Sequence, residues 1–257
     1  MAGELKIDSR RKKILEILRR DGQVRVTQLS ETLGASVVTI RSDLDSLEED
    51  GYLERTSGGA IQTMRNYYNL EFQRRKHERM EMKKAIAAAA AAMVRDGDTL
   101  FINSGTTTFF TAVELRQRKN LNIVTNSISV AVELGGMPTF RVILLGGDVN
   151  AQYSFSCGDD AKEQIARYRA DWAVLSVDGV NPGTGITTYH AEESVIDRIM
   201  MERAEKTLIV ADSSKLGRES FSRICALSSG TILITDSEAD ASMMERIAEE
   251  GVTIQLA

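Results

Sequence analysis

The stretch that decides the fold of the first part of this chain reads Ser36-Val-Val-Thr-Ile-Arg-Ser-Asp-Leu-Asp-Ser-Leu47. Its apolar residues recur at spacings of 3, 4 and 3, as on the buried face of a helix. They are Val37, Ile40, Leu44 and Leu47. The opposite face carries Val38, Thr39, Ser42 and Ser46, with Arg41 on its flank. Such a face suits close approach to DNA bases and phosphates, although an ordinary solvent-exposed helix has a similar composition.

The residues before this helix predict a helix-turn-helix. A helix over about 27–33 ends at Gly34, and Ser36 is the N-cap of the next helix, so the turn between them is tight. An earlier helix begins with basic residues at positions 10–13. The apolar residues that these two helices turn inward are Ile14, Leu15, Leu18, Leu29 and Leu33. Three short helices in this order present one of them to a DNA groove.

A β-hairpin is predicted directly after the third helix. Gly51 ends the helix, residues 52–55 form a strand, Ser57-Gly58-Gly59 form the tip, and residues 60–61 begin the return strand. A hairpin in this place is a wing, and its tip can contact the phosphate backbone. The candidate DNA-binding residues are therefore Ser36, Val38, Thr39, Arg41, Ser42, Arg55, Ser57 and Gly58.

Length and composition allow this small module and one larger domain. The chain has 257 residues, of which 42% are hydrophobic, and no apolar run has the length of a membrane span. Its first residues lack the pattern of a signal peptide, so we expect a cytoplasmic protein. Cys157 and Cys225 lie far apart, with no metal-ligand spacing near them. We expect reduced thiols, no metal and no cofactor.

The net charge of −5 supports DNA binding only through its distribution. Residues 1–61 hold 10 Lys or Arg and 11 Asp or Glu, which is close to neutral for a DNA-binding module. Basic residues gather in positions 10–25, whereas positions 43–54 are mostly acidic. An uneven surface of this kind can face phosphate with its positive side, and its low net charge favours specific over promiscuous binding.

A long helix is predicted from Glu71 to about residue 95, after a stretch over 62–69 that lacks periodicity and suggests a hinge. The helix is rich in alanine towards its end and basic at its start. The basic residues are Arg74, Arg75, Lys76 and Arg79, and His77 beside them is expected on the surface. The basic part is either a solvent-exposed helix face or a source of additional contacts to DNA phosphates.

From Thr99 onwards, strands and helices alternate. Short apolar runs predict strands at 100–102, 121–124, 142–145, 172–177, 207–210 and 232–235. Helical stretches are predicted near 107–118, 127–134, 159–168, 191–205 and 239–249. Buried strands separated by helices predict an α/β fold, a mostly parallel sheet with helices on both faces. In such sheets ligands bind at the carboxyl ends of the strands.

The loop Asn103-Ser-Gly-Thr-Thr-Thr108 follows the first of these strands and opens a helix. Gly105 permits a close backbone approach, and the amides and hydroxyls that follow it at a helix N-terminus suit an anion. Helix capping needs only one Ser or Thr, so three consecutive threonines favour phosphate binding. The candidate effector-binding residues here are Asn103, Ser104, Gly105, Thr106, Thr107 and Thr108.

Polar loops follow the later strands, and a parallel sheet would bring them to the same crevice. The further candidates in these loops are Asn126, Gly146, Gly147, Asp178, His190 and Lys215. Lys215 can supply a point charge to a phosphate, or it can simply be solvated. His190 can bond a sugar hydroxyl, or it can be a surface residue at a helix start, where Glu192 and Glu193 favour the helix dipole.

Several of these motifs resemble the DeoR family of bacterial transcriptional regulators. The resemblance rests on residues 24–26, 39–44, 47–53 and 58–60, and continues through Asn103-Ser-Gly-Thr-Thr-Thr, Thr125-Asn-Ser, Leu145-Gly-Gly and Ala211-Asp-Ser-Ser-Lys-Leu-Gly. It implies a winged helix-turn-helix over 1–62, a linker over 63–80 and an effector-sensing domain over 81–257. The chain departs from the family pattern at Ser42, where a second arginine is common, and at Asn103, where an aspartate is common.

The resemblance further implies a sensor domain similar to the sugar-phosphate isomerase and coenzyme-A transferase fold, with a phosphorylated sugar as effector. The partners expected are double-stranded operator DNA and a second copy of the chain, as a homodimer or homotetramer, because one short helix reads too few base pairs. The resemblance thus implies a transcriptional regulator, a repressor of a carbohydrate-utilisation operon, and not an enzyme. An isomerase-like enzyme is the alternative, but Asp178-Gly179 is followed by Val180 and Asn181, without a carboxylate that could act as base. A structural DNA-binding protein would leave the polar loops unexplained.

Overall fold

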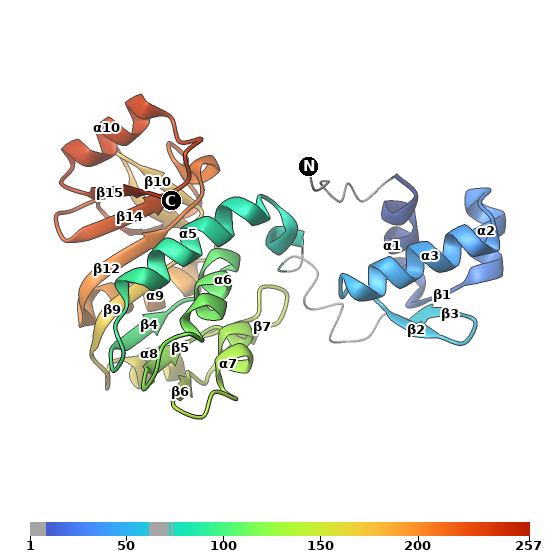
Figure 1. Cartoon of the computed structure of the whole chain (residues 1–257), viewed down its shortest axis with the longest axis horizontal. Coiled ribbons are helices and arrows are strands. Elements are labelled where there is room, and N and C mark those ends of the chain that lie inside the picture. Colours follow the sequence, from blue (N-terminus) through green and yellow to red (C-terminus); the bar gives the residue numbers. More distant parts are fainter. Residues whose placement is uncertain (1–8, 62–71, 73) are drawn as a thin grey trace. The chain divides into compact units, whose positions relative to one another are not determined.

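The structure is a computed structural model that describes residues 9–61, 72 and 74–257 (Figure 1). The chain divides into two compact units, Met1–Arg74 and Arg75–Ala257. Much of the predicted 63–80 linker lies outside the described residues. Each unit is described by itself below.

The first unit is a helix-turn-helix with a small antiparallel sheet. Its helices are α1 (Ser9–Asp21), α2 (Val26–Leu33) and α3 (Val37–Glu49), and its strands are β1 (Gln23–Arg25), β2 (Glu54–Thr56) and β3 (Gly59–Ile61). The strands pair in the order β1-β3-β2. The predicted helices and hairpin are confirmed, and β1 adds a strand that the sequence patterns did not indicate. Gly34 ends α2 in the left-handed conformation, and Ser36 caps α3 by accepting a hydrogen bond from the Thr39 amide, as expected.

The core of this unit begins one turn later in α3 than the sequence spacing predicted. Ile40, Leu44 and Leu47 are fully buried together with Ile14 and Leu18, but Val37 is 37% exposed, so the prediction for Val37 was wrong. Leu33 and Ala35, which flank the tight turn, pack against the core.

Two arginines of α1 hold α3 in place. Arg10 donates to both carboxylate oxygens of Asp43, at 2.5 and 3.1 Å, and Arg11 donates to Asp43 at 3.2 Å and to Ser46 at 3.2 Å. Asp43 is 3% exposed, and these hydrogen bonds keep its pKa below the ordinary value although burial acts to raise it. The basic start of α1 therefore serves the packing of α1 on α3.

The second unit is built on one seven-stranded parallel sheet. The strands are β4 (Thr99–Ile102), β5 (Asn122–Thr125), β6 (Arg141–Leu144), β9 (Ala170–Leu175), β12 (Ala204–Val210), β14 (Thr231–Thr235) and β15 (Thr253–Leu256). The helices are α5 (Met80–Met93), α6 (Thr106–Leu115), α7 (Ile128–Leu134), α8 (Asp159–Ile165), α9 (Ala191–Arg203) and α10 (Ala241–Glu249). The six predicted strands and five predicted helices after residue 99 are confirmed, and β15 is an additional edge strand.

Helices cover both faces of the sheet, as predicted, because adjacent strand residues point to opposite sides. Phe101 belongs to one buried cluster, together with residues of α8, α9 and α10. Its neighbours Leu100 and Ile102 belong to the other cluster, together with residues of α5, α6 and α7. Figure 1 shows α5 and α6 side by side over this second face. Nearly continuous apolar strands are thus explained by burial on both sides.

The strand order places a reversal of direction between β4 and β9. The order is β15-β14-β12-β9-β4-β5-β6, so the chain runs outward from β4 through β5 to β6, then returns to the other side of β4 with β9. Loops after β4 and β9 diverge at such a point and leave a crevice at the carboxyl ends of the strands. The site is therefore expected between the loops after β4, β9 and β12.

Short antiparallel strands extend the loops on both sides of this reversal. β7 (Asp148–Asn150) pairs with β8 (Phe155–Cys157), and β11 (Gly185–Thr188) pairs with both β10 (Gly179–Asn181) and β13 (Ser222–Cys225). None of these strands was predicted from the sequence. The two cysteines are free thiols, in agreement with the expectation of reduced cysteines.

The prediction of one long helix from Glu71 was wrong for the described part. Arg79 has a φ of 52° and a ψ of 38°, so the helical path breaks there and α5 begins at Met80. Residues 74–77 before the break are helical as well, and residues 78–79 form a turn. None of the described helices combines the length and apolar character that a membrane crossing needs.

Candidate functional site

The loop after β4 is shaped by a glycine that has no room for a side chain. Gly105 is in an extended conformation, with a φ of 174°. A Cβ at this position would overlap the Cβ of Ser176, in the loop after β9, and would lie 2.7 Å from the Ser176 hydroxyl oxygen. The two loops can therefore pack together only with glycine here. This packing sets the first turn of α6, Thr106 and Thr107, along the wall of the crevice.

Asn103 connects the same two loops by hydrogen bonds. Its Nδ2 donates to the Ser176 carbonyl at 2.9 Å and to Asp197 Oδ1 at 3.1 Å, and its Oδ1 accepts from the Ser176 amide at 2.9 Å. Asn103 is fully buried, and so is Thr108, which donates to the carbonyls of Asn103 and Gly105. Asn103, Gly105 and Thr108 thus shape the loop, and Ser104 donates to the Tyr153 carbonyl at 3.1 Å.

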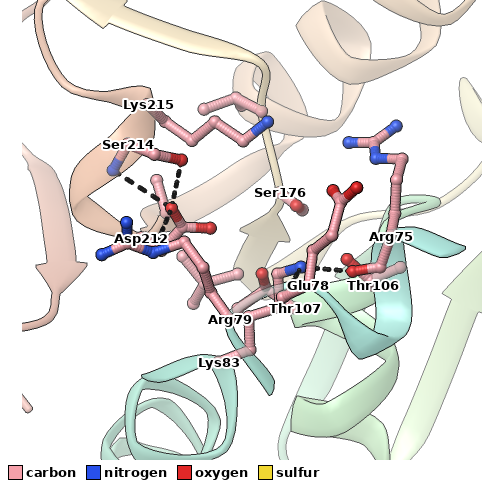
Figure 2. Close-up of a pocket in the computed structure, with 13 residues that line it drawn as sticks. Arg75, Glu78, Arg79, Lys83, Thr106, Thr107, Ser176, Asp212, Ser214 and Lys215 are labelled. Atoms are coloured by element: carbon pink, nitrogen blue, oxygen red, sulfur yellow. Dashed lines mark hydrogen bonds and ion pairs between the residues drawn. The ribbon is translucent and has the colours of Figure 1, made fainter. Parts of the chain in front are cut away.

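The crevice contains a hollow of about 390 Å³. Its lining comes from the segment 75–83, the first turn of α6, and the loops after β9 and β12. Arg75, Glu78, Arg79, Lys83, Thr106, Thr107, Ser176, Asp212, Ser214 and Lys215 are labelled in Figure 2. Four of these ten side chains are cationic at neutral pH, and two threonines stand at a helix N-terminus. The chemistry of the hollow therefore suits a small anion.

Asp178 balances two of the cations. Arg75 lies 2.9 Å from Asp178 Oδ1, and Lys215 lies 3.6 Å from the same oxygen. Burial alone would raise the pKa of Asp178, but the charges of Arg75 and Lys215 hold it below the ordinary value. Burial also lowers the pKa of Lys215. These side chains are pre-positioned, with charges that an incoming anion can share or take over.

Arg79 forms a second group of contacts at the other end of the hollow, beside Asp212 (Figure 2). Its guanidinium lies 3.4 Å from Asp212, donates to Ser213 Oγ at 2.7 Å and contacts Glu238 at 2.7 Å. Asp212 also accepts from the amide and hydroxyl of Ser214, at 3.1 and 2.5 Å. The left-handed backbone at Arg79 is thus held by contacts on its side chain.

Lys83 anchors the segment that carries these arginines. It is 5% exposed, and its ammonium donates to the carbonyls of Arg75 and Glu78, the latter at 2.6 Å. Burial lowers the pKa of Lys83 to about 8. Lys76 lies over the Phe109 ring of α6, with 4.4 Å between its Nζ and the ring centroid. Lys83 therefore holds the residues before Met80 against the start of α5, and Lys76 holds the segment against α6.

These contacts change the interpretation of the basic segment. Arg75 and Arg79 contact acidic residues of the α/β unit, so they do not form the solvent-exposed helix face that was one of the two predictions. Their side chains are also engaged in the hollow, which does not favour the other prediction, contacts to DNA. His77 is exposed, as expected. The arginines were missed as site residues because their positions follow from the break at Arg79.

Of the twelve predicted effector residues, three line the hollow, Asp178 pairs with two of its cations, and four others shape the loop after β4. The remaining four are also outside the lining. Asn126 is buried and donates to the Ser156 carbonyl, and the Gly146 amide donates to the Gln164 side chain. Gly147 has a φ of 130° and faces the Cys157 carbonyl closely. These three residues follow β5 and β6, on the far side of β4 from the reversal, and therefore do not join the loops after β9 and β12.

His190, the fourth, stands in an aromatic cluster. Its ring centroid lies 4.3 Å from that of Tyr153, 5.1 Å from that of Tyr189 and 5.4 Å from that of Phe155. Burial lowers the pKa of His190. Its backbone carbonyl accepts from the Ser194 amide, at the start of α9. His190 is thus packed at a helix start, beside the Tyr189 amide that donates to Asp178 at 3.0 Å.

The first unit presents the predicted contact residues on α3 and the hairpin. Val38 is 75% exposed, and Arg41 and Ser42 are exposed beside it. Arg55 is braced, since it contacts Asp45 at 2.8 Å and donates to the Gly59 carbonyl at 2.5 Å. Ser57 and Gly58 form the exposed tip, and the Gly58 carbonyl accepts from the Val26 amide at 3.0 Å.

A helix-turn-helix with an adjacent hairpin, joined to an α/β unit with a cation-lined hollow, defines the class of DNA-binding regulators. Residues 10–65 match the DeoR-like helix-turn-helix domain, and residues 78–237 match the DeoR C terminal sensor domain. The chain belongs to the DeoR family of transcriptional regulators, in agreement with the resemblance read from its motifs.

Relatives over the whole length carry regulator names. The chain is 32% identical over 249 residues to the putative aga operon transcriptional repressor of Escherichia coli O157:H7, covering 96% of this chain and 93% of that one. It is 33% identical to the HTH-type transcriptional regulator GlpR of Haloferax volcanii, covering 95% and 96%. It is 29% identical to the glycerol-3-phosphate regulon repressor of Escherichia coli K12, covering 98% and 100%.

Among solved structures, the chain is similar to ribose 5-phosphate isomerase A from Methanocaldococcus jannaschii, with a TM-score of 0.39 and 16% identity over 53% of this chain and 54% of that one. It is also similar to the Pyrococcus horikoshii translation initiation factor eIF-2B, with a TM-score of 0.40 and 15% identity over 83% and 75%.

Proposed function

We propose that this chain is a repressor of a carbohydrate-utilisation operon, and that a phosphorylated sugar or sugar derivative bound in the hollow controls its affinity for operator DNA. The observation that carries the proposal is the meeting of Thr106 and Thr107, at the N-terminus of α6, with the cations Arg75 and Lys215. Helix amides, hydroxyls and two cations are the groups that bind phosphate in proteins.

The remaining lining of the hollow supports a small polyhydroxylated ligand. Ser176, Ser214 and Glu78 add hydroxyl and carboxylate groups that can bond to sugar hydroxyls. The names of two relatives, an aga operon repressor and a glycerol-3-phosphate regulon repressor, point in the same direction.

The proposal includes binding without catalysis. An aldose–ketose isomerase needs a carboxylate that is free to take a proton from the sugar carbon. Asp178 is held by Arg75 and Lys215, and Asp212 is held by Ser214 and Arg79. Relatives that match the whole chain are named as regulators, and this supports a receptor instead of an enzyme.

DNA recognition in this proposal uses α3 and the hairpin of two copies of the chain in the cytoplasm. The contact residues proposed are Ser36, Val38, Thr39, Arg41, Ser42, Arg55, Ser57 and Gly58. A homodimer or homotetramer places two such modules on paired half-sites, because one helix reads only a few base pairs. Ligand binding then acts on the segment that leads to Arg75, with a coupling energy of about 1–3 kcal/mol.

The test separates the two parts of the protein. A labelled duplex, selected in vitro with the full-length protein, is titrated in anisotropy measurements with and without a panel of phosphorylated sugars. Arg41→Ala should lose specific DNA binding. Lys215→Ala and Thr106→Ala should keep it and lose the response to the sugar, whereas Lys162→Ala, a half-buried residue of α8 outside the lining of the hollow, should behave as wild type.

The ligand itself is identified by thermal shift. A ligand at 100 times its dissociation constant stabilises the folded state by about 2.7 kcal/mol, and this shift should be absent in Lys215→Ala. The proposal is wrong if the folded Lys215→Ala and Thr106→Ala variants lose DNA binding as severely as Arg41→Ala. It is equally wrong if turnover of a sugar phosphate, and no effect on DNA binding, is found.

A further inference from the structure

Two acidic residues of α9, Glu193 and Asp197, are buried. Glu193 is 7% exposed and Asp197 is fully buried, and they stand four positions apart on the inward face of the helix. Within the described residues, no lysine, arginine or histidine forms an ion pair with either of them. Carboxylates at this spacing repel each other when both are ionised.

The polar contacts of the pair are few. Asp197 Oδ1 accepts from Asn103 Nδ2 at 3.1 Å, whereas its Oδ2 is buried and finds no partner in the described part of the chain. Glu193 accepts from the Thr188 hydroxyl at 3.3 Å. The charged or titratable groups around the pair are Asp178, Arg75, Cys157 on β8 and Cys225 on β13.

The pair holds protons at neutral pH for a physical reason. Two unpaired carboxylates cost more to bury ionised than to protonate. Burial, with a smaller contribution from neighbouring carboxylates, raises the pKa of Asp197 to about 8 and that of Glu193 well above its ordinary value. The charge of Arg75 acts to lower the pKa of Glu193 but does not offset burial, and its guanidinium is 2.9 Å from Asp178.

Each member of the pair is connected to the lining of the hollow through intervening side chains. Asp197 bonds Asn103, and Asn103 holds both backbone groups of Ser176, a lining residue. Glu193 shares the Thr188 hydroxyl with Asp178, which lies against Arg75 and Lys215. A negative charge on the pair therefore lowers the affinity of the hollow for an anion, and an anion in the hollow raises the pKa of the pair.

We propose that binding of an anion in the hollow is coupled to proton uptake by the buried carboxylates Glu193 and Asp197, so that the sensor binds its ligand more weakly as the pH rises above neutrality. The inference rests on the proposed function of the hollow as an anion site. A bound anion disfavours the ionised pair, and by linkage the ionised pair disfavours the anion. A tenfold change in affinity corresponds to about 1.4 kcal/mol of repulsion between the anion and the ionised pair, the order of magnitude expected for partly buried charges.

The experiment uses sulfate as the probe, because its charge stays constant between pH 7 and 9 while that of phosphate does not. Sulfate is titrated calorimetrically into the full-length protein in two buffers with different ionisation enthalpies, which gives the number of protons taken up. Wild type should bind sulfate about tenfold more weakly at pH 9 than at pH 7, with proton uptake near pH 8. Glu193→Gln with Asp197→Asn should lose most of that uptake, and the matched change Glu192→Gln, exposed on the same helix, should not.

The same variants distinguish the effect of the pair from that of the lysines. Lys83 has a pKa of about 8, so its loss of a proton also weakens anion binding as the pH rises. This part of the pH dependence persists in the double variant. Proton uptake that is unchanged in a folded double variant, or in Asp197→Asn alone, overturns the coupling while leaving the anion site intact. Absence of sulfate binding, or binding that is unaffected by Lys215→Ala, overturns the anion site itself. Folding of each variant is checked by the fluorescence of Trp172, the single tryptophan of the chain.

Discussion

Replacement of Gly105 by alanine tests whether the contact between two loops builds the site. The backbone of Gly105 is extended, so alanine adopts it without strain, and the effect of the change is purely steric. The new methyl group would overlap Ser176 Cβ and would lie 3.1 Å from Thr108 Oγ1. Overpacking of this kind costs about 1–3 kcal/mol. The first turn of α6 must then move away from the loop after β9.

The assay combines stability and binding. Trp172, in the central strand β9, reports the unfolding of the α/β unit in urea or on heating, and each kcal/mol lost lowers the midpoint by about 2–4 °C. Affinity for the anion should fall by about tenfold or more, because a charge-assisted hydrogen bond of the displaced turn contributes about 1.5–3 kcal/mol. Gly136→Ala is the matched control, since a methyl group there meets only open space.

The double variant makes the argument refutable. Ser176→Gly removes the Cβ that the new methyl group meets, and on its own it costs less than about 1 kcal/mol. Combined with Gly105→Ala, it should restore at least about 1 kcal/mol relative to the sum of the single changes. If Gly105→Ala is as stable as wild type, or if the two changes are additive, the packing of these loops does not shape the site.

Three further changes address other parts of the molecule. Asp43→Ala should destabilise the helix-turn-helix by about 1–3 kcal/mol, a value discounted for the partial exposure of Arg10. Circular dichroism of the full-length protein should then show a first unfolding transition at a lower temperature. A single unchanged transition would contradict the role of Asp43. Gly59→Ala should abolish DNA binding, because its methyl group would overlap the Val24 carbonyl and open the pairing of β1 with β3. Unchanged DNA binding by a folded Gly59→Ala variant would contradict this role of the wing. The raised pKa of Asp197 predicts that its contribution to stability is fully present below about pH 4, declines as the pH rises and is lost above about pH 8. The urea midpoint of the Trp172 signal should therefore fall with pH more steeply in wild type than in Asp197→Asn. Equal slopes in the two proteins would refute this.

Local patterns in the sequence were sufficient for the elements whose character is local. Apolar runs such as 207–210 could only be buried strands, and the spacing of Ile40, Leu44 and Leu47 could only be one helix face. Val37 was misplaced because periodicity does not show where a helix enters the core. The strands β10, β11 and β13 were missed because they are short and are defined by pairing between distant segments.

The candidate site was predicted only as far as it depends on single loops. Thr106, Thr107 and Lys215 line the hollow, as expected for residues that follow β4 and β12. The exclusion of Asn126 and Gly146 follows from the order of the strands, which no local pattern records. Arg75 and Arg79 were missed for a similar reason, because an interrupted helix at a non-glycine residue has no sequence signal.

The pairing of Lys215 and Arg75 with Asp178 means that an arriving solute has to compete with a resident counterion. A singly charged species such as chloride or acetate offers these cations no more than the carboxylate already supplies, so exchange brings little gain. A doubly charged group bonded by the helix amides and both cations offers more. The abundant monovalent anions of a cell should thus not displace Asp178 from the two cations. Selectivity for doubly charged phosphate esters then arises from charge alone, without any contact to a sugar hydroxyl.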